Sequence, residues 1–396
     1  MHYDPFMLKI VGAVLGILAV ALVSRVLRQP HVIGYLAAGV VLGPHGLAVV
    51  SDQNTLARVG DFGVLLLLFF VGMETNPREL LARWRITFVG TAAQIALSLG
   101  VMFGVGVWLH WQMPRIVLMG FVISLSSTAL VLNYLRETGQ TDAKVGRDAL
   151  GILLAQDLAV IVMLLVTDAM ADGGIDGETL ILQGVGSLLT IALVVWIVRG
   201  RGLRLPLAAR FRADKELQIF LAFALCLTLA FLSEAFELSA SLGAFVAGML
   251  VAASRDTEWV ADRMEPFRVL FLALFFVSVG LLVQLEFVFD HAVLLAAVTF
   301  AVLFGNTLIN ASIFRALGDP WRYSLYAGAH LAQIGEFSFV LAALGVRARL
   351  ITNFEYQLTL SVIVATLMLS PAWIAIVGRG QRGLDRLIGS PAQNDA

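Results

Sequence analysis

The chain is too apolar to be a soluble protein. Of its 396 residues, 59% are hydrophobic and 14% are charged, and its mean hydropathy is +0.88. These values exclude an ordinary soluble globular domain. The formal net charge of −1 provides no excess of basic residues for nucleic acid. The sequence therefore predicts an all-α polytopic membrane protein whose solvent is the lipid bilayer.

Apolar runs between charged joints predict about thirteen transmembrane helices, since crossing the hydrocarbon takes about 20 residues. The first run has Asp4 and Lys9 beside it and no small-residue cleavage pattern, so we interpret it as a retained span and not as a signal peptide. The predicted spans are residues 6–24, 31–49, 57–74, 86–109, 114–135, 146–168, 179–199, 215–234, 239–254, 266–284, 288–314, 320–346 and 355–378.

The positive charges indicate which way the chain crosses the membrane. Of the 27 Lys and Arg residues, 22 lie in the C-terminal tail or in the joints after odd-numbered spans, counted with the span ends beside those joints, and 5 lie on the opposite face. Cytoplasmic loops carry the excess of Lys and Arg. We therefore expect a multi-pass protein of the bacterial inner membrane with its N-terminus outside and its C-terminus in the cytoplasm.

Two clusters of small and polar residues interrupt the apolar spans. The first, Ser124–Thr128, lies in the fifth span, and the second, Gln333–Ser338, lies seven spans later in the twelfth. Interrupted helices at matching positions of two halves are typical of inverted-repeat transporters, because unwound backbone and half-helix ends can bind ions at the bilayer midplane. The sequence therefore predicts two inverted repeats with crossed broken helices.

These repeats define the expected domain organisation. We predict one transmembrane transport domain over residues 1–378. Its first repeat covers about 6–168, a connecting helix about 179–199 and the second repeat about 215–378. Residues 379–396 are expected to form a short cytoplasmic tail without a nucleotide-binding domain.

Asp157 is the strongest candidate for a functional residue. It lies in the sixth span, roughly 15 to 18 Å along the helix from Gly146 at 1.5 Å per residue, which is close to the bilayer centre. A carboxylate at that depth is costly unless it lines a wet cavity or meets a cation. Burial favours the protonated carboxyl and a nearby cation favours the carboxylate, so a proton and a metal ion can compete for the group. The alternative is a structural acid that is hydrogen-bonded to a neighbouring helix or paired with a base.

Neighbouring polar residues could complete an ion site. Gln156 offers a neutral carbonyl oxygen, although a hydrogen bond between helices explains it equally well. Ser127, Thr128 and Ser278 offer hydroxyl ligands, although hydroxyls in membrane helices more often bond to backbone. Glu336 is expected to act electrostatically at a half-helix end. We expect no cofactor, and no metal beyond the transported monovalent cation.

Seven motifs follow one another along nearly the whole chain. They are HVIGYLAAGVVLGPHGL (31–47), GVLLLLFFVGMETN (63–76), SLSSTALVL (124–132), LLAQDLAV (153–160), LGAFVAGML (242–250), EPFRVLFLALFFVSVGL (265–281) and AQIGEFSFVL (332–341). Together they resemble the membrane domain of Kef-type potassium efflux antiporters, within the larger monovalent cation/proton antiporter family that includes sodium/proton exchangers.

The resemblance implies roles for the candidate residues. Gln156 and Asp157 stand where the family has its ion-binding pair, and Gln before Asp is typical of potassium-handling members. Ser278 matches a position facing the site, segments 124–129 and 332–337 match the crossed broken helices, and Glu336 matches the family's acid there. The family also implies an elevator mechanism and a homodimer.

Two features depart from the family's pattern. Asn306 stands where many relatives carry a lysine, so the charge balance of the site differs. Kef proteins also carry a cytoplasmic nucleotide-binding domain that senses glutathione adducts, whereas this sequence stops eighteen residues after Gly378. Glutathione gating therefore cannot be assigned, and the two interpretations are a truncated chain or a short member with a separate cytoplasmic regulatory subunit.

The sequence thus predicts a secondary transporter and no enzyme. The leading hypothesis is potassium/proton exchange, and the alternatives are a sodium/proton antiporter of the same fold and a gated cation channel. An intramembrane hydrolase that used Asp157 and Glu336 as a carboxylate pair has no supporting nucleophile–base grouping or metal motif.

Overall fold

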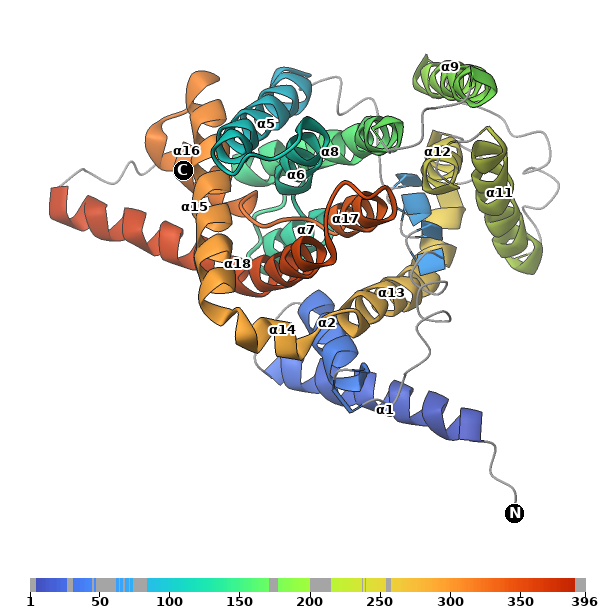
Figure 1. The fold of residues 1–396 in the computed structure, drawn as a ribbon, viewed down its shortest axis with the longest axis horizontal. Coiled ribbons are helices and arrows are strands. Elements are labelled where there is room, and N and C mark those ends of the chain that lie inside the picture. The colour runs from blue at the N-terminus through green and yellow to red at the C-terminus, as the bar shows by residue number, and fades with distance from the viewer. Residues whose placement is uncertain are drawn as a thin grey trace. The chain divides into compact units, whose positions relative to one another are not determined.

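The computed structural model is almost entirely helical (Figure 1), and no strand occurs among the residues that it describes. The structure describes residues 5–26, 31–44, 46–47, 62–63, 65–66, 68–70, 72–73, 84–170, 177–199, 215–236, 238, 240–253 and 258–388. The predicted all-α class is therefore confirmed.

The helices follow the predicted spans closely. Helices of the first half are α1 (Pro5–Val26), α2 (His31–Leu42), the π-helix η1 (Arg85–Gly90), α5 (Thr91–Trp108), α6 (Met113–Ser124), α7 (Thr128–Glu137), α8 (Lys144–Ala169) and α9 (Gly177–Arg199). Helices of the second half are α11 (Lys215–Ala235), α12 (Ala240–Ala253), α13 (Glu258–Leu281), α14 (Leu285–Asp290), α15 (Ala292–Ala316), α16 (Trp321–His330), α17 (Phe337–Arg347) and α18 (Asn353–Ile388).

Four segments differ from the predicted spans or lie partly outside the described residues. Helix α2 ends at Leu42, before the predicted end of the second span at residue 49, and α13 begins at Glu258, before the predicted start of the tenth span at residue 266. The third span, 57–74, lies only partly within the described residues, and those that are described are helical. The last span was predicted to end at residue 378, whereas α18 continues to Ile388 and so takes up the first part of the predicted tail.

Several helices have the length and composition of membrane spans. Within the described ranges, four are long and apolar enough to cross a bilayer: Arg85–Trp108, Met264–Leu281, Ala292–Ala316 and Asn353–Arg379. The other apolar helices found there are shorter, and they include α6 and α17, each of which is one half of an interrupted span.

The chain forms two compact units. Unit 1 contains residues 1–82 and 161–286, and unit 2 contains residues 83–160 and 287–396. Each unit therefore combines a segment from the first half of the chain with a segment from the second. Helix α8 begins in unit 2 and ends in unit 1.

Unit 1 is held by helices whose backbones touch. A Cβ atom added at Gly39 on α2 would lie 2.2 Å from Val277 O on α13, and one added at Gly280 would lie 2.2 Å from Leu36 O. Small residues permit such close approach between membrane helices, where van der Waals contact replaces the hydrophobic effect as the driving force. The α2–α13 crossing, which Figure 1 shows in blue and gold, therefore depends on glycine on both sides.

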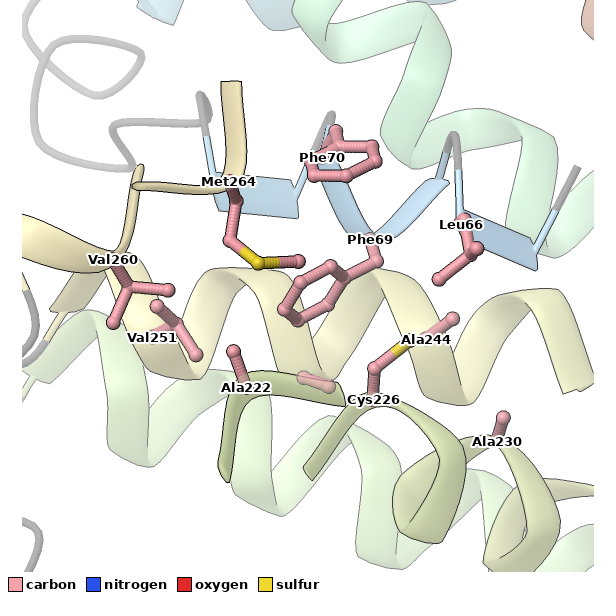
Figure 2. Close-up of a cluster of buried hydrophobic side chains, with 11 residues drawn as sticks. Leu66, Phe69, Phe70, Ala222, Cys226, Ala230, Ala244, Val251, Val260 and Met264 are labelled. Atoms are coloured by element: carbon pink, nitrogen blue, oxygen red, sulfur yellow. The ribbon is translucent and has the colours of Figure 1, made fainter. Parts of the chain in front are cut away.

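An apolar cluster fills the rest of unit 1. Figure 2 shows Phe69 beside Met264, with side chains of α11 and α12 packed below them. Cys226 is fully buried in this cluster and carries a free thiol.

The close crossing in unit 1 yields a stability prediction. Gly280→Ala should lower the midpoint of thermal unfolding in detergent, because its Cβ would meet backbone that no side-chain rotation can move. Gly184→Ala on α9 is the matched control, since nothing lies within 4 Å of its added Cβ and alanine favours helix over glycine by about 1 kcal/mol. Unfolding is monitored by tryptophan fluorescence. Equal unfolding midpoints for the two variants would contradict the predicted packing.

Unit 2 is organised around α15. This helix packs against α16 and α18, and it also contacts α5. The core beneath α15 contains Ile152 of α8, Phe314 of α15 and Leu331 just after α16, all fully buried. Unit 2 therefore brings α8, which carries Asp157, together with the second interrupted span.

Candidate functional site

The first interruption is a true break in the helix. Helix α6 ends at Ser124 and α7 begins at Thr128, and both Leu125 (φ −91°, ψ 130°) and Ser127 (φ −81°, ψ 112°) have extended backbone. Ser127 caps α7, because its hydroxyl oxygen accepts a hydrogen bond from Leu130 N at 3.3 Å. The predicted interruption of the fifth span is confirmed.

The second interruption is also a break, and it meets the first. Helix α16 ends at His330 and α17 begins at Phe337. Gly335 N donates to Leu125 O at 2.8 Å, and Ser126 Oγ donates to Leu331 O at 2.9 Å. A Cβ atom at Gly335 would lie 2.5 Å from Ser126 O, so only glycine allows the two backbones to approach this closely.

The end of α6 shows why the break is stable inside a membrane. The last four carbonyl groups of a helix have no partner within it, and in lipid each must find one elsewhere. Here all four accept hydrogen bonds from side chains. The pairs are Ser124 Oγ to Phe121 O (2.8 Å), Ser338 Oγ to Val122 O (2.7 Å), Asn306 Nδ2 to Ile123 O (2.9 Å) and Gln94 Nε2 to Ser124 O (3.0 Å).

Asp157 lies beside the start of α7. Its side chain is 2% exposed, and its Oδ2 atom accepts a hydrogen bond of 3.0 Å from Thr128 Oγ1. Thr128 is the first residue of α7, so the carboxylate faces a helix N-terminus, where the helix dipole stabilises negative charge. The structure thus joins two of the predicted site residues, Asp157 and Thr128.

The side chain of Gln156 is hydrogen-bonded at the first break. Its Oε1 atom accepts from Ser126 N at 2.9 Å, and its Nε2 atom donates to Gln94 Oε1. Of the two interpretations left open by the sequence, these bonds favour the interhelical hydrogen bond over an ion ligand. Gln94, which is 1% exposed on α5, was not among the residues singled out from the sequence.

Asn306 joins the two breaks. Its Nδ2 group donates to Ile123 O at the end of α6 and to Ala332 O in the second break, at 2.9 and 3.1 Å. Both protons of this neutral amide are thus used. Asn310, one turn later on α15, donates to Asn306 O at 2.9 Å and supports this arrangement.

The remaining predicted residues lie in different places. Glu336 is 1% exposed and precedes α17, within the second break. Ser278 belongs to unit 1, on α13, where its hydroxyl donates to Phe275 O at 2.7 Å. The structure therefore groups Asp157, Gln156, Thr128, Ser127, Asn306 and Glu336 in unit 2, and Ser278 lies in the other unit.

The chemistry of this grouping suits a small cation. The oxygen atoms at hand are carboxylate, hydroxyl and backbone carbonyl oxygens, which are the ligands preferred by hard cations. The amides of Gln94, Gln156 and Asn306 are neutral, so they satisfy the open backbone without adding charge. One buried carboxylate, Asp157, then has direct hydroxyl support at a helix end.

The sequence is similar to those of several known transporters. It is 34% identical to the iron transporter MagA of Paramagnetospirillum magneticum over 96% of this chain and 88% of that protein. It is 31% identical to the putative cation/proton antiporter YbaL of Escherichia coli over 95% of this chain and 69% of that protein. It is also 31% identical to K(+) efflux antiporter 5 of Arabidopsis thaliana, over 90% of this chain and 64% of the plant protein.

The fold and the family agree with these similarities. The structure resembles that of the sodium proton antiporter MjNhaP1 from Methanocaldococcus jannaschii at pH 8, with a TM-score of 0.68, 16% identity and coverage of 96% of this chain and 99% of that one. The model of the sodium/hydrogen exchanger transmembrane family matches residues 10–380. The chain therefore belongs to the sodium/hydrogen exchanger family, a class of multi-pass secondary transporters that exchange cations for protons.

Proposed function

We propose that this chain is a potassium/proton antiporter in which Asp157 binds the proton and the cation alternately. The observation that carries the proposal is the buried Asp157 carboxylate, which accepts from Thr128 Oγ1 at the N-terminus of α7 beside two crossed breaks. A single buried carboxylate holds either one proton or one cation, so the two compete. Competition for one group gives one-for-one exchange.

The other predicted site residues take supporting places in this proposal. Ser127 and Thr128 supply hydroxyl oxygens at the start of α7, and Ser278, on α13, is a further candidate hydroxyl ligand by its match to the family's motif. Gln156 and Asn306 hold the unwound backbone in place, as their hydrogen bonds to Ser126 N and Ile123 O suggest. Glu336 supplies negative charge near the second break.

Potassium is favoured over two other ions. The Gln–Asp pair and the similarity to a K(+) efflux antiporter support potassium. A sodium/proton antiporter of the same fold is the second candidate. The relative named as an iron transporter suggests iron, but in the part of the chain that the structure describes no group of three His, Cys, Asp or Glu residues could hold such a metal. A site in which Asp157 is proposed to be the single ligating carboxylate suits a monovalent ion better.

The transport cycle is proposed to be of the elevator type, in which the part that carries Asp157 moves past a scaffold that forms a homodimer. Each unit combines segments from both halves of the chain, as expected for two interleaved inverted repeats at about 6–168 and 215–378. The proposed setting is a bacterial inner membrane, with the N-terminus outside and the C-terminus in the cytoplasm.

An ion-replacement assay tests the function. Purified protein in liposomes with an acidic lumen and an enclosed pH-sensitive dye should alkalinise the lumen when potassium is added outside, because protons leave as cations enter. Potassium, sodium, rubidium and Fe²⁺ are added separately, and potassium should act at the lowest concentration.

Three outcomes would overturn the assignment. A lower half-maximal concentration for sodium would make the chain a sodium/proton antiporter, and alkalinisation by Fe²⁺ alone would favour iron. A potassium tracer flux whose rate does not depend on the pH gradient would favour a gated cation channel, since exchange couples the two ions through one conformational cycle.

A further inference from the structure

Two glutamine side chains bridge the first break between α6 and α7. Ser126 N donates to Gln156 Oε1, Gln156 Nε2 donates to Gln94 Oε1, and Gln94 Nε2 donates to Ser124 O. We propose that Gln94, on α5, is a positioning residue that sets the ion preference of the site at Asp157. This inference rests on the proposed function, because it concerns which cation that site accepts.

The direction of this two-amide bridge is fixed at both ends. Ser126 N can only donate, so the oxygen of Gln156 must face it, and Ser124 O can only accept, so the nitrogen of Gln94 must face it. The bond between the two side chains then has one consistent arrangement, with Gln156 donating and Gln94 accepting. Neither side chain can rotate its amide without placing like groups against each other.

The bridge replaces the bonds of the missing helical turn. In an uninterrupted α-helix Ser126 N would donate to the carbonyl four residues earlier, and Ser124 O would accept from Thr128 N. Here Val122 O is taken by Ser338 Oγ instead, and Ser124 O is taken by Gln94. The two glutamines therefore fix both sides of a gap only a few residues long, and the residue that follows the gap is Thr128.

Gln94 thereby acts on Asp157 along two routes. Through Ser124 and Ser126 it fixes the backbone that places Thr128, whose hydroxyl donates to Asp157 Oδ2. Through Gln156 it holds the residue next to Asp157 on α8. Potassium and sodium differ in the distances at which oxygen ligands surround them, so a small shift of Thr128 against Asp157 changes their relative binding.

Neighbouring residues on α5 supply a control. Thr91, Gln94 and Ser98 form a buried polar stripe on one face of this helix, each at most 4% exposed. Thr91 Oγ1 donates to Ile152 O at 3.3 Å, whereas Ser98 Oγ has no hydrogen-bond partner in the described structure. Ser98→Ala thus changes a buried polar residue on the same face without touching the bridge.

The experiment compares Gln94→Leu with Ser98→Ala in the liposome assay, with thermal unfolding as the test of folding. Gln94→Leu should raise the half-maximal potassium concentration at least about fivefold, the effect of one typical hydrogen bond, while the value for sodium changes less. The ratio of the two values should therefore shift, with a smaller change in the maximal rate. Ser98→Ala should leave the ratio at the wild-type value.

A double-mutant cycle separates the bridge from general packing. Gln94 and Gln156 share one chain of hydrogen bonds. Adding Gln94→Leu to Gln156→Leu should therefore cause little further change in the ratio of the half-maximal concentrations for potassium and sodium. If Gln94→Leu fails to fold, Gln94→Asn keeps the amide but is one methylene too short to reach both partners, and the same shift is expected.

Two results would overturn the role of Gln94. The first is an unchanged ratio of the half-maximal potassium and sodium concentrations in a folded Gln94 variant. The second is full additivity of the effects of Gln94→Leu and Gln156→Leu on that ratio. Either result, obtained with wild-type protein that exchanges potassium for protons, leaves the proposed function intact. Absence of exchange in the wild-type protein would instead refute the proposed function itself.

Discussion

Asp157→Asn should abolish cation-driven proton movement and reduce it to the level of liposomes without protein. Asparagine has the same shape, and its side-chain oxygen can still accept the hydrogen bond from Thr128 Oγ1, so the break and the fold should survive. What is lost is the group that can hold a proton or a negative charge. The measurement is the initial rate of lumenal alkalinisation after potassium addition, together with the unfolding midpoint.

Asp148→Asn is the matched control, because it makes the same substitution on the same helix. Asp148 is 1% exposed, and its Oδ2 atom contacts Lys144 Nζ at 3.0 Å and accepts from Tyr323 OH at 2.7 Å. The amide oxygen of asparagine can still accept from both groups, so exchange should continue, with some loss of thermal stability. Exchange at the wild-type rate in Asp157→Asn would remove that residue from the mechanism.

Asn306→Asp should disrupt unit 2 more than Asn306→Ala does. Alanine leaves Ile123 O and Ala332 O without the shared donor, at a cost of about 1–3 kcal/mol for each buried carbonyl that stays unsatisfied. Aspartate keeps the shape but replaces both donated protons with acceptor oxygens that repel the two carbonyls. Thermal unfolding of each purified variant in detergent should place the midpoints in the order wild type, alanine, aspartate.

Thr299→Val supplies the comparison for Asn306 on the same helix. Thr299 is 3% exposed on α15, and within the described residues its hydroxyl has no hydrogen-bond partner. Valine is close to it in shape, so this variant should unfold at the wild-type temperature. An aspartate variant at position 306 that is as stable as the wild-type protein would show that the amide does not hold the two breaks together.

Much of the fold could be predicted from composition and interruption alone. Runs of about 20 apolar residues located the helices, because lipid leaves the backbone few alternatives to the helix. Ser124–Thr128 and Gln333–Ser338 were recognisable as breaks, since clustered hydroxyl and amide groups have no role in a lipid-facing helix. Both breaks are present, whereas the end of α18 was placed too early because residues 379–388 are polar yet helical.

The partners within the site could not be predicted. Gln94 lies in the mostly apolar run TAAQIALSLG, and its bond to Gln156 spans 62 residues of sequence. One buried glutamine looks the same in sequence whether it packs, caps a helix or binds an ion, and only the facing helix decides. The same reason left Gln156 with two interpretations, whereas Asp157 stood out because an isolated acid deep in a membrane has few structural uses.

The backbone contacts of unit 1 also bear on how the protein can diversify. At Gly39 and Gly280 no side-chain atoms separate α2 from α13, so no neighbouring rotamer can adapt to a larger residue. The breaks in unit 2 are held instead by amides and hydroxyls that a few substitutions could exchange for others while keeping the bonds. Under the proposed function, a change of transported ion is therefore expected to need substitutions in unit 2, whereas the α2–α13 crossing should tolerate almost none.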